Sequence, residues 1–200
     1  MKIIFATANE GKMREIRRIA DACGNYYVCS LKEAGIMPEI NENGTSFEEN
    51  ALIKVRAVGP QEDALVMADD SGIEIDAFQG APGVYSARFM GEDTPYTVKN
   101  RAILDRMQGL AAEERGARYR CVIALLFPDG TERVFEDCME GRITEGEPRG
   151  EGGFGYDPIF YVPEANKTAA ELTDSEKDAV SHRGKALRKA FLALQTGEIS

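Results

Sequence analysis

The strand–helix–strand pattern that decides the fold class lies in residues 2–29, KIIFATANEGKMREIRRIADACGNYYVC. An apolar stretch at 2–6 predicts a short buried strand, and apolar residues at 13, 16, 19, 20 and 23 then recur at helical spacing. Gly24 marks the end of that helix, and residues 26–29 predict a second strand. This order favours an α/β fold, in which helices flank a sheet.

The rest of the chain continues the mixture of strands and helices. A capping box at Ser46 and Glu49 begins an expected helix that runs to about Val58, and strands at 65–68 and 73–77 are expected around a polar turn. A helix at 94–110 and a hairpin of strands at 119–127 and 132–138 come next. A glycine-rich loop at 146–158 follows, and the last helices come after a second capping box at Thr173 and Glu176. No repeat or clear linker interrupts this order. We therefore expect a single domain over residues 1–200, with a tail at 195–200 outside its core.

Composition narrows the class of protein. The chain has 200 residues, of which 43% are hydrophobic, so it can bury a core without metal or disulfide support. Its net charge of −10 argues against binding to nucleic acid or anionic membranes. Four cysteines without a C-x-x-C pair and a single histidine argue against a zinc site and favour a reduced, cytoplasmic setting. Neither a signal peptide nor a transmembrane segment is expected.

The first candidate site lies between the first strand and the first helix, at Thr7-Ala8-Asn9-Glu10-Gly11-Lys12. A helix N-terminus at the carboxyl end of a strand is a natural phosphate site, because its backbone N–H groups are unpaired. Thr7 and Asn9 can donate hydrogen bonds, and Lys12 adds a positive charge. By itself the stretch also fits an ordinary asparagine N-cap followed by a solvated lysine.

Two adjacent carboxylates, Asp69 and Asp70, follow a buried apolar strand. Burying both is costly unless a cation joins them, and Mg²⁺ prefers one or two carboxylates plus phosphate oxygens. Because neighbouring side chains of an extended strand point in opposite directions, we expect only one of the two to be a direct ligand. Glu42, in a polar loop, is a further candidate ligand. The alternative is a polar turn between two strands.

The glycine-rich loop contains GEGGFG at 150–155, which matches a dinucleotide-binding fingerprint. The fingerprint must open a helix, whereas an extended stretch is expected here, so we reject that interpretation. Glycines around Phe154 let its ring stand clear of the backbone and stack on a base, and Asp157 can accept a hydrogen bond from a base or sugar. The alternative is a tight hairpin with Phe154 facing the core.

A basic group lies near the C-terminus, at Lys177, His182 and Arg183. Lys177 and Arg183 are six positions apart and cannot share one face of an uninterrupted helix. A helix break near Ser181 would allow both to serve one site. The alternative is a solvated basic helix end.

Taken together and in this order, these stretches closely resemble the inosine triphosphate pyrophosphatase family, also called Ham1-like or non-standard purine nucleoside triphosphate pyrophosphatases. The resemblance extends from Lys2 to about Leu194. Its motifs are ATANEGK at 6–12, SFEENA at 46–51, ADDSG at 68–72, GAPGVYSAR at 80–88, residues 152–158, and KTAAEL at 167–172 through to Arg183.

The resemblance implies an elongated α/β fold with a long mixed sheet, two lobes with a central substrate cleft, and a homodimer. It also implies Mg²⁺-dependent attack of water on the α phosphorus of ITP, dITP and XTP, which gives the monophosphate and pyrophosphate. Such an enzyme removes deaminated purines from the nucleotide pool.

The same resemblance assigns roles to individual residues. It makes Asp70 the general base and a metal ligand, with Glu42 and Asp69 as further metal ligands. The substrate-binding residues that it implies are Thr7, Ala8, Asn9, Glu10, Gly11, Lys12, Lys54, Ser71, Phe154, Gly155, Tyr156, Asp157, Lys177, His182 and Arg183.

Simple chemistry agrees with these roles, since hydrolysis of a tetra-anionic triphosphate needs a base and neutralising cations. Selection of a 6-keto purine needs a hydrogen-bond donor at O6. Two other functions stay open: a related pyrophosphatase for pyrimidine or modified nucleotides, and a sensor that binds a nucleotide without hydrolysing it. A nucleic-acid-binding module is disfavoured, because the sequence has no basic stripe.

Overall fold

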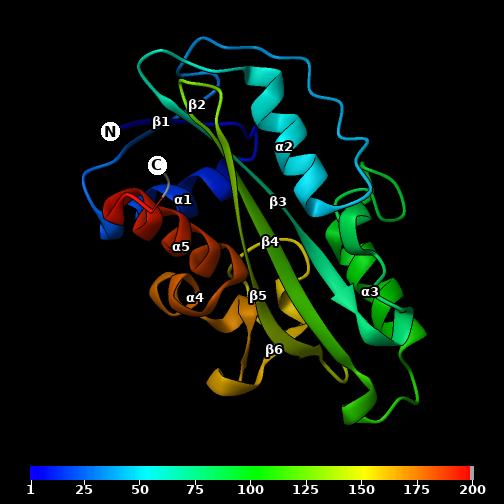
Figure 1. The fold of residues 1–200 in the computed structure, drawn as a ribbon. Coiled ribbons are helices and arrows are strands. Elements are labelled where there is room, and N and C mark those ends of the chain that lie inside the picture. Colours follow the sequence, from blue (N-terminus) through cyan, green and yellow to red (C-terminus); the bar gives the residue numbers. More distant parts are fainter. Residues whose placement is uncertain (199–200) are drawn as a thin grey trace. The chain divides into compact units, whose positions relative to one another are not determined.

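A computed structural model describes residues 1–198 of the chain (Figure 1). Its strands are hydrogen-bonded in the order β2-β1-β3-β4-β5-β6-β7, with both parallel and antiparallel neighbours. The strands are β1 (Lys2–Phe5), β2 (Tyr27–Ser30), β3 (Leu65–Ile75), β4 (Gly116–Leu126), β5 (Glu132–Ile143), β6 (Phe160–Val162) and β7 (Lys167–Thr168). The helices are α1 (Glu10–Cys23), α2 (Phe47–Val58), α3 (Tyr96–Arg106), α4 (Asp174–Val180) and α5 (His182–Thr196). The predicted α/β class with a mixed sheet is confirmed. No helix within residues 1–198 is long and apolar enough to cross a membrane.

The chain divides into two compact units, which we describe separately. Unit 1 comprises Met1–Asp70, Cys121–Asp137 and the described chain from His182 onward, and unit 2 comprises Ser71–Arg120 and Cys138–Ser181. The expectation of a single domain over residues 1–200 stays a prediction. So does the placing of the tail at 195–200 outside the core, and residues 199 and 200 of that tail lie outside the described residues.

Unit 1 is built on parallel pairing, in which Ile3 of β1 lies opposite Val28 of β2 and Leu65 of β3. Helices α1 and α5 cover one face of this part of the sheet, and α2 covers the other (Figure 1). The main core of unit 1 is made of the buried side chains of Ile3, Phe5, Met13, Ile16, Ile19, Ala20, Val28, Leu65, Met67, Cys121, Ile123, Leu125, Ala186, Leu187, Ala190 and Phe191. This core fixes the carboxyl end of β1 next to the start of α1.

Unit 2 is built on antiparallel pairing at the other end of the strand order. Tyr161 of β6 lies opposite Arg142 of β5 on one side and Thr168 of β7 on the other. A second core fills this unit, and it includes Ile73, Ile75, Ile103, Met107, Tyr119, Ile143, Tyr156, Ile159, Phe160 and Val162. A hydrogen bond attaches the glycine-rich loop to α3, because the Asn100 amide donates to the Gly155 carbonyl at 3.2 Å.

Strand β3 corrects one sequence prediction. It runs without a break from Leu65 to Ile75, so the expected polar turn at 69–72 is wrong. The strand continues because Ile73 and Ile75 extend its buried apolar pattern and because both aspartates have cationic partners. Strands β4 and β5 are also longer than expected, and α3 is shorter.

A helix break is present at Ser181, which is the condition for Lys177 and Arg183 to serve one site. Helix α4 ends at Val180 and α5 begins at His182, with Ser181 in an extended conformation between them. The Thr173 and Glu176 capping box that starts α4 is also present, as predicted.

Candidate active site

The loop between β1 and α1 has the geometry of a capped helix start. The Asn9 side chain accepts from the Lys12 backbone N–H at 3.0 Å, and the Asn9 N–H donates to Thr7 Oγ1 at 3.2 Å. Ala8, Asn9 and Glu10 are exposed, so the start of α1 lies at the surface of unit 1. An exposed helix N-terminus with a lysine in its first turn suits an anion such as a phosphate.

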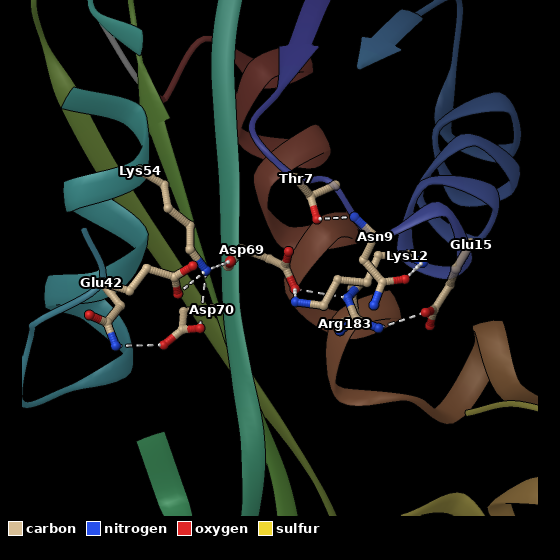
Figure 2. A network of polar contacts seen from close by, with 10 residues as sticks. Thr7, Asn9, Lys12, Glu15, Glu42, Lys54, Asp69, Asp70 and Arg183 are labelled. Atoms are coloured by element: carbon tan, nitrogen blue, oxygen red, sulfur yellow. Dashed lines mark hydrogen bonds and ion pairs between the residues drawn. The ribbon is translucent and has the colours of Figure 1, made fainter. Parts of the chain in front are cut away.

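The two aspartates of β3 point to opposite faces of the strand, as expected for neighbours on an extended chain (Figure 2). Asp69 faces α1 and α5, and Asp70 faces α2 (Figure 2). Asp69 is 1% exposed and Asp70 is 8% exposed, so each charge depends on the groups that unit 1 supplies beside it.

Asp69 is held by two cations. Its Oδ2 lies 2.8 Å from Lys12 Nζ and accepts from Arg183 Nε at 3.1 Å. Arg183 is itself buried, and its Nη1 donates to Glu15 Oε2 at 2.6 Å. Burial alone would raise the pKa of Asp69, but Lys12 and Arg183 outweigh burial and hold that pKa well below its usual range. The Asp69 carboxylate is therefore ionised and already occupied by cations.

Asp70 has weaker compensation. Its Oδ1 lies 3.2 Å from Lys54 Nζ, and its Oδ2 accepts from the Asn50 amide at 3.1 Å. The Lys54 ammonium is shared with Glu42 Oε2 at 2.7 Å and with the Asp69 backbone carbonyl at 3.0 Å. Burial raises the pKa of Asp70, and the opposing effect of Lys54 does not cancel the rise. Asp70 therefore has a greater affinity for a proton than an ordinary aspartate, which suits a general base.

The Asp70 side of β3 also suits a divalent cation. The carboxylates of Glu42 and Asp70 converge on a single ammonium, so negative charge is in excess there. Within residues 1–198 no three Asp, Glu, His or Cys residues are grouped so that they could hold a metal by themselves. Mg²⁺ does not need such a group, because it keeps several waters and shares substrate phosphates with one or two carboxylates. Asp69 does not fit the same ion, since its carboxylate lies on the other face with Lys12 and Arg183 (Figure 2).

In unit 2, the glycine-rich loop gathers a second group of predicted residues. Asp157 Oδ2 accepts from the Phe154 backbone N–H at 2.8 Å and from Lys177 Nζ at 2.5 Å. The Lys177 ammonium lies 4.9 Å from the centre of the Phe154 ring. Phe154 is 40% exposed, so it is not the core-facing residue of the alternative interpretation.

A single glycine permits this close arrangement. Gly153 has φ +68°, and a Cβ atom there would lie 2.1 Å from Asp157 Oδ2 and 3.0 Å from Lys177 Nζ. A side chain at position 153 would therefore push the carboxylate and the ammonium away from the loop.

The remaining predicted residues are distributed between the two units. His182 is buried at the start of α5 in unit 1, and Gly11 lies in the first turn of α1. Ser71 follows Asp70 along β3 and is the first residue of unit 2. Tyr156 is buried, with its hydroxyl donating to the Ser86 carbonyl at 2.6 Å. The Tyr156 ring is therefore part of the core of unit 2 and is not an exposed surface for stacking.

Sequence reasoning missed three polar residues of these networks: Glu15, Asn50 and Tyr119. Glu15 lies among the apolar positions of α1, three residues after Lys12, and a glutamate in that position signals a buried cation. Asn50 is in the first turns of α2, where it bridges the Gly44 N–H and Asp70. Nothing in the local sequence of β4 distinguishes Tyr119 from an ordinary core tyrosine.

Known proteins are similar to this chain over nearly its whole length. The model of the Ham1 family matches residues 3–192. A protein of Bacillus subtilis strain 168 named dITP/XTP pyrophosphatase is 47% identical over 192 residues, which cover 96% of this chain and 96% of that protein. A protein of Thermus thermophilus with the same name is 47% identical over 197 residues, or 98% of this chain and 93% of that one. Among solved structures, the Staphylococcus aureus Ham1 protein has a TM-score of 0.85 and 36% identity, and the match covers 98% of this chain and 100% of that one.

Proposed function

Because the chain belongs to the Ham1 family, we propose that it hydrolyses non-standard purine nucleoside triphosphates, namely ITP, dITP and XTP, to the monophosphate and pyrophosphate. The class of enzyme, a nucleoside-triphosphate pyrophosphatase, is the one to which its relatives belong. The observation that carries the proposal is the pair Asp69 and Asp70, because one carboxylate anchors cations while its neighbour keeps a raised pKa.

Unit 1 provides the groups for the triphosphate. The exposed start of α1, the Thr7 hydroxyl and the Lys12 ammonium form the proposed phosphate-binding group. Asp69 keeps Lys12 in place beside Arg183, which is itself paired with Asp69 and Glu15. Lys54 adds a further cation on the opposite face of β3. These groups offset the repulsion between an anionic nucleophile and a tetra-anionic substrate.

Asp70 acts as the general base in this proposal. Its Oδ2 accepts from Asn50 and its Oδ1 faces Lys54, which fixes the carboxylate for proton abstraction from a water molecule. That water attacks the α phosphorus in line with the departing pyrophosphate. Glu42 and Asp70 would hold Mg²⁺, which when bound supplies Lewis-acid polarisation of phosphate oxygens.

Unit 2 provides the groups for the base. The exposed ring of Phe154 offers a stacking surface, and the Lys177 ammonium beside it offers a donor to a 6-keto oxygen. Adenine presents an amino group at that position, and a mispaired buried donor costs about 1–3 kcal/mol. This difference favours ITP and XTP over ATP.

The family resemblance extends the proposal to the setting of the enzyme. We infer a homodimer in the cytoplasm that clears deaminated purines before they enter DNA or RNA. Sedimentation of the purified chain tests the first part directly.

The activity itself is tested with purified protein and Mg²⁺ against ITP, XTP, dITP, GTP and ATP, with products resolved by ion exchange. We expect monophosphate and pyrophosphate from ITP, XTP and dITP, and little product from GTP or ATP. Orthophosphate and a diphosphate would mean attack at the γ phosphorus. Binding of ITP without turnover would favour the nucleotide sensor instead.

A further inference from the structure

The Asp157 carboxylate in unit 2 accepts three hydrogen bonds, one of which the proposed function does not use. Its Oδ2 accepts from the Phe154 N–H and Lys177 Nζ, as described above. Its Oδ1 accepts from the Tyr119 hydroxyl at 3.2 Å. Asp157 is 3% exposed, so these donors replace the water that the charge would otherwise attract.

Tyr119 is placed to hold this carboxylate in position. It lies in the unit 2 part of β4, is 7% exposed, and packs its ring at 4.6 Å on Phe160. The core therefore fixes the ring, and the ring fixes the position of its hydroxyl. Burial, followed by the charge of Asp157, raises the pKa of Tyr119 well above its ordinary value, so the phenol keeps its proton and remains a donor.

A carboxylate held at one oxygen has its other oxygen fixed as well. The bond from Tyr119 to Oδ1 thus sets the direction of Oδ2, to which both the Phe154 N–H and Lys177 are attached. Gly153 lies directly beside this oxygen, because a Cβ atom added to it would overlap Oδ2. A rotation of the carboxylate would consequently move both the Phe154 backbone and the Lys177 ammonium.

We propose that Tyr119 is a positioning residue for base recognition, which acts through Asp157 to set the Phe154 ring and the Lys177 ammonium. This inference rests on the proposed function, in which Phe154 and Lys177 read the purine. Tyr119 does not contact the substrate. Its removal should weaken the recognition of the base and leave the binding of phosphates unchanged.

The test is Tyr119→Phe, which removes the hydroxyl and keeps the ring. We expect the KM for ITP to rise about tenfold, the usual order for losing a hydrogen bond to a charged group, with kcat within twofold of the wild type. Inhibition by IMP should weaken about tenfold, whereas inhibition by pyrophosphate should not change. The matched control is Tyr161→Phe, which removes an exposed hydroxyl of unit 2 that donates to Asn166, and it should leave all four values unchanged.

A double-mutant cycle with Asp157→Asn separates positioning from a general loss of stability. If Tyr119 acts through Asp157, Tyr119→Phe should add little to the KM once Asp157→Asn is present. Additive effects on KM, or equal weakening of IMP and pyrophosphate inhibition, would overturn the role of Tyr119. If the wild type does not hydrolyse ITP, the proposed function fails instead, and the two failures are distinguished in one experiment.

Should Tyr119→Phe not fold, a 3-fluorotyrosine at position 119 of the otherwise unchanged chain provides the measurement. Its ¹⁹F resonance should shift on addition of IMP, because the base perturbs Lys177 and Asp157, and should not shift with pyrophosphate. No response to IMP at concentrations that inhibit the enzyme would contradict the proposal.

Discussion

Asp69 and Asp70 are neighbours on one strand, yet the two faces of β3 surround them with opposite balances of charge (Figure 2). On the α1 and α5 face, Lys12 and Arg183 meet Asp69 and Glu15, so two cations balance two anions. On the α2 face, Lys54 pairs with both Asp70 and Glu42. The pKa of Asp69 falls and that of Asp70 rises.

The contrast shows how one strand can combine a structural charge with a reactive one. A buried carboxylate whose cations outweigh the cost of burial stays ionised and has a weakened affinity for a proton. A buried carboxylate that is only partly paired costs stability and is available for chemistry. The alternation of an extended strand separates these two roles by a single position.

The largest effect that tests the contrast is expected from Asp70→Asn. Loss of a general base should lower kcat for ITP by about 10²–10⁴-fold. The free energy of unfolding should stay the same or increase, because the substitution removes a charge that burial disfavours and leaves Lys54 with Glu42. Steady-state kinetics and urea unfolding measure the two quantities on one sample. Retained turnover with normal stability would rule out Asp70 as the base.

Asp69→Asn is the natural control for Asp70→Asn, because we expect it to lower the free energy of unfolding. It leaves the buried Arg183 and the partly exposed Lys12 with one carboxylate fewer, and breaking a buried ion pair from one side costs about 3–5 kcal/mol. We expect the urea midpoint to decrease strongly for Asp69→Asn and to stay the same or increase for Asp70→Asn. Equal losses for both variants would mean that the two faces do not differ.

The sequence predicted part of this arrangement, namely a strand that leads into the two aspartates and their opposed side chains. It named Lys12, Lys54 and Arg183 as substrate-binding residues and not as partners of these carboxylates. It did not predict that β3 continues through the two aspartates, because polar residues in series are typical of a turn and their partners come from distant segments. Arg183 and Asp69 are 114 positions apart, and no local pattern encodes such a pairing. Glu15 differs, because a glutamate among the apolar positions of α1 is a local sign of a buried cation, which sequence reasoning missed.

Glu15→Gln tests the balance of charge on the Asp69 face with a smaller effect. Arg183 loses one of its two carboxylates and keeps Asp69, so we expect a loss of about 1–3 kcal/mol in the free energy of unfolding. Glu48→Gln, at an exposed position of α2, is the matched control and should change little. A stability equal to that of the wild type would show that Glu15 does not stabilise buried Arg183.

The smallest effect is the difference in acid sensitivity between the two faces. Because folding lowers the pKa of Asp69, its contribution to stability is complete above the unfolded value of about 4 and is lost as the pH falls below it. Folding raises the pKa of Asp70, so its charge is a cost at neutral pH that protonation relieves as the pH falls toward the unfolded value. Relative to the wild type, Asp69→Asn should therefore lose stability less steeply on acidification, and Asp70→Asn more steeply. Each slope should differ by at most about 1.4 kcal/mol per pH unit, the value for one proton. Urea unfolding at a series of pH values between about 3 and 6, the range around the unfolded pKa, measures the slopes, and slopes that change in the same direction would contradict the opposed pKa shifts.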